Sequence, residues 1–326
     1  MPRIQKQFED FHTAILFDVD SSNDLRDRRD TILNNLSDKI SEDAPTYVKF
    51  TQGSYALYTG IIPLDGNPDF DIGIQFDCLT SDHEDPIDLK KYVAEALKHQ
   101  GRSVKIRRPC VTVTYFKDEK PLHHVDLAVY ATDVFGKTKI AWGKESDAKE
   151  NRTWETSRPK ELIELVTNKY IGDAKSQFRR CVRALKRWRD YKIGHSNLPS
   201  IGLTVAAYNV FSHQKDVIDG RPIDILALRD LANSILALWD GQRIKVSLPV
   251  EPYNDLFESM TDVQIADFKD KLTALRDALA DAHDHADTHE ACKIMVRHFG
   301  EDFPVPPKTE TTKKATSGVV PSGRSA

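Results

Sequence analysis

The segment from residue 69 to residue 77 alternates between polar and apolar positions. Its apolar positions are Phe70, Ile72, Ile74 and Phe76. Successive side chains of a strand point to opposite sides, so Asp69 and Asp71 share the other face. Two residues along a strand span roughly 6.5–7 Å, which lets both carboxylates contribute to one pair of metal ions. The pattern predicts a strand with one apolar face and one acidic face.

A second alternating segment, residues 124–130, places Asp126 opposite its apolar side. Residues 110–116 alternate as well, and the turn-rich residues 117–121 lie between the two, which predicts a hairpin. If the strand of Asp126 lies beside the strand of Asp69 and Asp71, three carboxylates meet at one place. The alternative is an ordinary half-solvated sheet whose exposed positions happen to be aspartates.

A Gly-Ser turn, Gly53-Ser54, stands between a predicted strand at residues 47–50 and a short helical segment at residues 55–58. The backbone N–H groups and the hydroxyl of such a turn can approach phosphate oxygens. Most Gly-Ser pairs are plain turns, and this one gains meaning from the carboxylates that follow. Three carboxylates suit two Mg²⁺ ions that hold a triphosphate and an attacking hydroxyl together. The combination predicts metal-dependent nucleotidyl transfer.

Residues 175–192 have the periodicity of a long amphipathic helix. Its predicted buried stripe consists of Phe178, Cys181, Val182, Leu185 and Trp188. An adjacent stripe carries Arg179, Arg183 and Lys186, a concentration of positive charge in a chain of net charge −4. This stripe either binds a polyphosphate or is a solvated helix face, the usual fate of such charges.

Another apolar helix begins near Ser200 and continues to residue 211. The Ser200 hydroxyl either caps this helix or binds a phosphate. From residue 158 onward the periodicity is almost wholly helical, which predicts an α+β chain in two lobes and a tail. The predicted domains are a core lobe at residues 1–155, a helical domain at 156–305 and a disordered tail at 306–326. This prediction allows the N-terminal helix, although it belongs to residues 1–155, to pack on the second lobe.

Composition indicates a globular protein with a large core: 326 residues, 40% hydrophobic and 29% charged. The slightly acidic charge disfavours nucleic acid as a partner. No apolar run approaches the roughly 18 residues that span a bilayer, and the N-terminus lacks a signal-peptide pattern, so we expect a cytoplasmic protein without membrane contact. The four cysteines show no framework spacing and are expected to be reduced.

One cluster suggests a different site. His283, His285, His289 and Cys292 lie close together in the sequence, and four such ligands can bind Zn²⁺. Acidic residues interleave with them, and no Cys-x-x-Cys pair is present. A solvated helix–loop–helix is the alternative.

Five short motifs occur in the order seen in the bacterial CD-NTases, the cGAS/DncV-like nucleotidyltransferases, and the chain most resembles the DncV branch from about residue 51 to residue 300. The motifs are Thr51-Gln52-Gly53-Ser54, Asp69-Phe70-Asp71-Ile72, His124-Val125-Asp126, Arg183 to Asp190, and Pro199 to Leu203. The resemblance implies a polymerase-β-like nucleotidyltransferase core with a mixed sheet and a helical domain. It also implies Mg²⁺-dependent synthesis, with Mn²⁺ as a substitute, of a cyclic di- or trinucleotide from ATP and/or GTP, in anti-phage signalling.

By position, the resemblance implies that Asp69 and Asp71 hold the metals and that Asp126 helps to activate the attacking ribose hydroxyl. The residues that it assigns to nucleotide binding are Gln52, Gly53, Ser54, Tyr58, Arg183, Lys186 and Ser200. The chain departs from the DncV pattern at Val111, where that branch carries an arginine, and in the position of the aromatic residues after the Gly-Ser turn. The resemblance therefore does not predict which bases this chain selects or which linkage it forms.

In some relatives the C-terminus is conjugated by a ubiquitin-like transfer system, and the small terminal Ala326 permits the same hypothesis here. Two other functions stay open from the sequence. One is a linear nucleotidyltransferase that modifies RNA or protein, and the other is a non-catalytic nucleotide sensor. The acidic net charge weighs against RNA, and three intact carboxylates weigh against the sensor.

Overall fold

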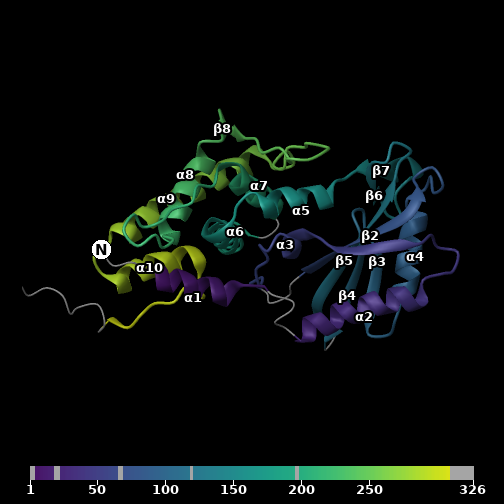
Figure 1. Cartoon of the computed structure of the whole chain (residues 1–326), viewed down its shortest axis with the longest axis horizontal. Helices are drawn as coiled ribbons and strands as arrows, with labels where there is room; N and C mark the ends of the chain where they lie inside the picture. Colours follow the sequence, from purple (N-terminus) through teal and green to yellow (C-terminus); the bar gives the residue numbers. More distant parts are fainter. Residues whose placement is uncertain (1–3, 18–22, 65–68, 118–119, 195–197, 309–326) are drawn as a thin grey trace, which may run out of the picture.

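The computed structural model describes residues 4–17, 23–64, 69–117, 120–194 and 198–308; the side chains of residues 23–25, 69, 117 and 120–123 fall outside this description. A lobe that contains the main sheet and a helical lobe lie at opposite ends of the molecule, with α3 and α5 between them (Figure 1). The strands are β1 Tyr47–Thr51, β2 Asp69–Leu79, β3 Arg102–Ile106, β4 Val111–Lys117, β5 Lys120–Thr132, β6 Thr138–Trp142, β7 Thr153–Thr156, β8 Trp239–Asp240 and β9 Arg243–Ile244. The α-helices are α1 Gln5–Ile15, α2 Asn23–Lys39, α3 Gly53–Ala56, α4 Ile87–Leu97, α5 Pro159–Asn168, α6 Gly172–Lys192, α7 Ser200–Val210, α8 Asp224–Leu236, α9 Asp262–Asp284 and α10 Thr288–Phe299.

The main sheet is mixed, with the order β1-β2-β5-β4-β3, and β6 and β7 extend it from β5. β2 and β5 run parallel to each other, whereas β1 pairs with β2, and β4 with β5, in antiparallel fashion. The predicted α+β fold with a mixed sheet is confirmed. The predicted hairpin at residues 110–130 is confirmed as β4 and β5, and it brings the strand of Asp126 beside the strand of Asp69 and Asp71.

One face of this sheet forms the core of its lobe. The alternating side chains of β2 from Phe70 to Phe76 are buried there as predicted, and α2 and α4 contact each other over the same core. The helix that follows Pro86 is α4, and the helix that carries Ile32 is α2. With this face buried, the acidic face of β2 is left to point toward the helical lobe.

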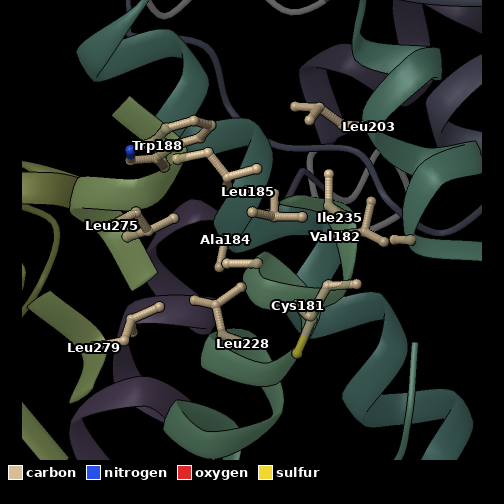
Figure 2. Close-up of a cluster of buried hydrophobic side chains, with 14 of the residues drawn as sticks. Cys181, Val182, Ala184, Leu185, Trp188, Leu203, Leu228, Ile235, Leu275 and Leu279 are labelled. Atoms are coloured by element: carbon tan, nitrogen blue, oxygen red, sulfur yellow. The ribbon is translucent and has the colours of Figure 1, made fainter. Parts of the chain in front are cut away.

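Helix α6 is the centre of the helical lobe (Figure 2). The predicted stripe from Phe178 to Trp188 is buried along its whole length. Around it, α7, α8 and α9 contribute Leu203, Leu228, Ile235, Leu275 and Leu279. Because α6 has apolar neighbours on several sides, its orientation is fixed, and its remaining stripe faces the sheet lobe.

A deletion in this core should be costly. We expect Leu185→Ala to lower the free energy of unfolding by about 2–5 kcal/mol, because Leu185 is fully buried and its loss leaves a cavity. The matched control is Leu165→Ala on α5, where the side chain is 41% exposed and the expected loss is below about 1 kcal/mol. Chemical denaturation of both variants measures the difference, and equal losses would contradict the assigned core.

Helix α1 is separated from the sheet and packs on the helical lobe. Phe8 and Phe11 belong to the core of the helical lobe. A buried polar network around Asp224 connects α1 with α6 and α8. Arg180 on α6 donates to both oxygens of Asp224 at 2.6 and 2.8 Å, and the His12 imidazole lies 3.6 Å from the same carboxylate. Burial lowers the pKa of His12 to about 4. The chain therefore starts on one lobe and crosses to the other at Phe17.

Among the residues described, no helix is both long enough and apolar enough to cross a membrane. The four cysteines are free thiols, and Cys110, Cys181 and Cys292 are buried. The tail predicted to be disordered comprises residues 306–326; residues 309–326 lie outside the description, and with them the hypothesis for Ala326. Residues 306–308 are described, and the Pro306 carbonyl contacts the His289 ring.

Candidate active site

The carboxylates of β2 and β5 meet because the two strands are parallel neighbours in one register. Asp71 is the backbone partner of Asp126, and Asp69 is the partner of His124. Neighbouring strands lie about 4.8 Å apart, so the paired residues Asp71 and Asp126 stand side by side on the sheet. The strand position of Asp69 is on the same face by its spacing, and its side chain lies outside the described part of the structure.

The Gly-Ser turn is fitted against Asp71. Gly53 begins α3 with φ of +67°, a conformation that favours glycine. A Cβ atom on Gly53 would lie 1.9 Å from Oδ2 of Asp71, so that only a residue without a side chain can occupy the position. The backbone N–H of Gln52 also donates to the Asp71 carbonyl at 3.1 Å. The turn and the acidic strand therefore form one rigid unit.

A cavity of about 280 Å³ opens between this unit and the helical lobe. It brings together six of the predicted site residues: Gly53, Ser54, Asp71, Asp126, Lys186 and Ser200. The sheet lobe supplies the carboxylates and the turn, and α6 and α7 supply the lysine and the serine. A ligand with negative charge fits the helical wall, and a cation fits the sheet wall.

The environment of Asp126 suits a divalent cation. Its Oδ1 atom is buried and has no hydrogen-bond partner among the described residues. Burial, and the nearby Asp126 carboxylate, raise the pKa of the Cys110 thiol to about 12, which keeps this neighbour neutral. A buried carboxylate oxygen without a donor is unfavourable by itself and is the ligand type that Mg²⁺ prefers. The described side chains contain no cluster of three His, Cys, Asp or Glu that could hold a metal, and Asp69 is outside that set.

Lys186 is a cationic residue of the cavity wall, and it is buried. Its ammonium donates to the carbonyl and to the hydroxyl of Thr59, both at 3.0 Å. Burial and the neighbouring Arg189 lower the pKa of Lys186 to about 7. The interpretation of this stripe as a solvated helix face is wrong at Lys186, because the segment after α3 covers it.

The other two members of the stripe contact the same segment. Arg183 donates to the Tyr58 carbonyl at 2.9 Å, and the Arg179 guanidinium lies 4.1 Å from the centre of the Tyr58 ring. Neither arginine lines the cavity. Tyr58 is 59% exposed and is absent from the cavity wall as well. The roles of Arg183 and Tyr58 in nucleotide binding stay predictions.

Gln52 is close to the cavity without lining it. Its side-chain oxygen accepts a hydrogen bond from the Tyr130 hydroxyl at 2.8 Å, and burial raises the pKa of that phenol. Ser200 lines the cavity, and it is the first residue of α7 after the N-cap position, which Pro199 occupies. The N-cap role considered for Ser200 is therefore wrong, since proline precedes it there and no side-chain cap bond forms. Its hydroxyl remains available to a ligand as a prediction.

Three polar residues of the cavity wall were not predicted as site residues: Arg189, Asp190 and Thr204. Arg189 donates to Asp190 at 2.7 Å and to the carbonyl of Leu198 at 3.3 Å, which fixes the chain just before Ser200. Their signal was present in the sequence. Arg189 and Asp190 follow Lys186 by three and four residues, and Thr204 follows Ser200 by four, so each pair shares a helix face.

The cluster around His283 does not gather as a metal site. His283 interacts with Asp284, His285 with the carbonyl of Asp287, and His289 with the carbonyl of Pro306. Cys292 is buried in the helical core, where burial raises the pKa of its thiol to about 12. The described residues offer each member a different environment, which favours the helix–loop–helix interpretation.

A pH effect follows from the burial of Lys186. We expect the affinity for a triphosphate to fall as the pH rises from about 7 to about 9, by up to about tenfold per pH unit, because only the ammonium attracts phosphate. Binding raises the pKa of the lysine and takes up a proton, so the loss occurs above the pKa of the free protein. Calorimetric titration of ATP at several pH values measures it. Lys186→Met should bind weakly at every pH, and a wild-type slope in that variant would contradict the assignment.

The comparisons with known proteins agree with this geometry. Residues 48–130 match the family model for the nucleotidyltransferase domain of DncV-like cyclic GMP-AMP synthases. This range contains β1, the Gly-Ser turn, β2 and the Asp126 strand.

Three solved structures share the fold over almost the whole chain. Vibrio cholerae DncV cyclic AMP-GMP synthase is 17% identical, with 93% of this chain and 97% of that chain covered and a TM-score of 0.73. The Bradyrhizobium diazoefficiens CD-NTase CdnG, solved with GTP, is 14% identical, with 94% and 96% covered and a TM-score of 0.67. Escherichia coli MS115-1 CdnC, solved as a complex with HORMA, is 16% identical, with 92% and 98% covered and a TM-score of 0.67.

Proposed function

We propose that this chain, which belongs to the cGAS/DncV-like nucleotidyltransferases (CD-NTases) and is an enzyme of that type, synthesises a cyclic di- or trinucleotide from ATP and/or GTP with release of pyrophosphate. The observation that carries the proposal is the cavity. Its wall contains Asp71, Asp126 and the Gly53-Ser54 turn from the sheet lobe, together with Lys186 from the helical lobe. A triphosphate needs cations and N–H donors along its length, and its reacting α-phosphate needs metal ions beside it.

Asp71 and Asp126, with Asp69 on the same strand face, are the residues that would hold Mg²⁺, and Mn²⁺ has the same ligand preference. Bound Mg²⁺ supplies charge neutralisation at the α-phosphate and the leaving pyrophosphate. The residues of the chain orient the reactants. The Gly53-Ser54 turn offers N–H groups and a hydroxyl to the phosphates, and Lys186 offers its ammonium.

Asp126 has the further role of aligning the acceptor ribose hydroxyl, since its buried Oδ1 has an open acceptor site. The hydroxyl oxygen forms a bond to the α-phosphorus, the bond to the β-phosphate oxygen breaks, and the hydroxyl proton is released. A second reaction of the same kind within the linear product closes the ring. The cavity between the lobes is lined by residues of both, which supports such a repeated use of one site.

We extend the proposal to the biological setting. The resemblance to the anti-phage CD-NTases supports a second messenger of defence against phage, produced in the cytoplasm. The CdnC–HORMA complex supports regulation by a protein partner. The predicted division into a core lobe at residues 1–155 and a helical domain at 156–305 belongs to the same proposal. The two separate hydrophobic cores support it apart from α1, which packs in the core of the helical domain.

The test uses purified protein with Mg²⁺ or Mn²⁺ and the four labelled nucleoside triphosphates, followed by phosphatase treatment and mass spectrometry. A phosphatase-resistant product that disappears in Asp71→Asn supports the cyclic product and identifies its bases. A phosphatase-sensitive product indicates a linear transferase. Binding without release of pyrophosphate, with either metal, would indicate the sensor and contradict the proposal.

A further inference from the structure

We propose that Thr59 is a positioning residue for triphosphate binding, which acts by holding the Lys186 ammonium at the cavity wall and at a fixed place relative to the Ser54 turn. The inference rests on the proposed function, because it concerns the same cavity. Thr59 lies outside the five motifs that carry the resemblance, and its side chain does not line the cavity.

The contact between Thr59 and Lys186 is enclosed. Thr59 is fully buried, and Lys186 is only 3% exposed. The ammonium has three N–H donors, and the carbonyl and hydroxyl oxygens of Thr59 accept two of them, each at 3.0 Å. Since Lys186 also lines the cavity, the remaining donor is the one that can serve a ligand there. Thr59 thus determines the direction in which the remaining N–H donor of the Lys186 ammonium points.

Thr59 also contacts the Gly-Ser turn. Its backbone N–H donates to the Ser54 carbonyl at 2.9 Å, and its hydroxyl donates to the same carbonyl at 3.4 Å. A hydroxyl has one donor and two acceptor positions, so it can bond to Ser54 and to Lys186 together. One residue therefore fixes the spacing between two predicted phosphate ligands that come from different lobes.

The segment that carries Thr59 is itself fastened to α6. Arg183 holds the Tyr58 carbonyl and Arg179 covers the Tyr58 ring, while Tyr58 has φ of +56°, which is uncommon for a residue other than glycine. These contacts keep the acceptors of Thr59 in place. The carboxylates of Asp190 and Asp71 also attract the Lys186 charge. Thr59 keeps the lysine from neutralising a carboxylate that is needed for Mg²⁺.

The experiment compares Thr59→Val, Thr59→Ser and a control, Thr273→Val, whose hydroxyl bonds only within α9. Calorimetry with inorganic tripolyphosphate and with ATP, each with Mg²⁺, measures binding, and steady-state assays of pyrophosphate release measure KM and kcat. We expect Thr59→Val to weaken both ligands about tenfold and to raise KM by a similar factor, with kcat changed less than about threefold. Thr59→Ser and Thr273→Val should match the wild type.

A double-mutant cycle separates positioning from general destabilisation. If Thr59 acts through Lys186, adding Thr59→Val to Lys186→Met should not weaken tripolyphosphate binding further. Additive losses, or wild-type binding by Thr59→Val, would overturn the inference. If Thr59→Val is unfolded, the comparison of Thr59→Ser with Thr59→Ala in the same assays decides it, since only serine keeps the hydroxyl. Failure of the wild type to bind ATP would instead contradict the proposed function.

Discussion

Asp126→Asn is expected to lower kcat by about 10³-fold or more, while the affinity for ATP changes only a few-fold. The substitution keeps the shape of the side chain and removes one negative charge. Asp126 lines the cavity together with Asp71, and its Oδ1 atom is buried without a hydrogen-bond partner among the described residues. A loss confined to turnover is what a group needed in the transition state produces. Assays of pyrophosphate release and calorimetric titration of ATP measure the two effects.

The same variant should be at least as stable as the wild type in the absence of nucleotide. A buried carboxylate oxygen without a donor destabilises the folded protein, and an amide there costs less. Asp77→Asn is the control, because Asp77 lies exposed on the neighbouring strand β2, outside the cavity. A variant of Asp126 that loses stability and turnover together would show that Asp126 supports the fold, and would contradict its assignment to the chemistry.

Alternation along β2 and β5 was enough to predict the acidic face of the sheet. The period of a strand is two, so a carboxylate in the sequence fixes its face without knowledge of the neighbours. The sequence left open whether the strand of Asp126 lies beside the strand of Asp71. The structure pairs the two strands in parallel, with β2 on one side of β5 and β4 on the other. The stripe of α6 was equally clear, since each of its apolar residues is buried.

The environment of Lys186 was not predictable in this way. Its partner Thr59 is 127 residues away, and no local pattern indicates that the segment after α3 folds over α6. Charged residues on a helix are usually solvated, so periodicity alone favoured the wrong interpretation. For Ser200 the reason is local: Pro199 takes the N-cap position, and Ser200 becomes the first helical residue. Contacts between the lobes determine the environment of Lys186, and such contacts leave no periodic pattern in the sequence.

Gly53→Ala is expected to lower turnover by about 100-fold or more and to lower the free energy of unfolding by about 2–4 kcal/mol. Two effects add at this position. The φ of +67° disfavours any residue with a Cβ, and that Cβ would lie 1.9 Å from Asp71 Oδ2. Because the cavity depends on the place of this carboxylate, the shift that relieves the clash displaces a proposed metal ligand. Thermal or chemical denaturation and pyrophosphate release give the two magnitudes.

Gly136→Ala separates the two effects. Gly136 has a similar φ of +76°, yet a Cβ there would meet nothing within 4 Å. It should therefore show only the backbone cost of about 1 kcal/mol and full activity.

The excess loss of stability in Gly53→Ala then measures the contact with Asp71. Adding Asp71→Ala to Gly53→Ala should restore part of the stability, because the clashing oxygen is gone. Equal losses of stability and turnover in Gly53→Ala and Gly136→Ala would contradict a requirement for close packing of the turn against Asp71. If the double variant regains stability but has no turnover, Gly53 is needed to leave space for the Asp71 carboxylate, and that carboxylate is needed for the reaction.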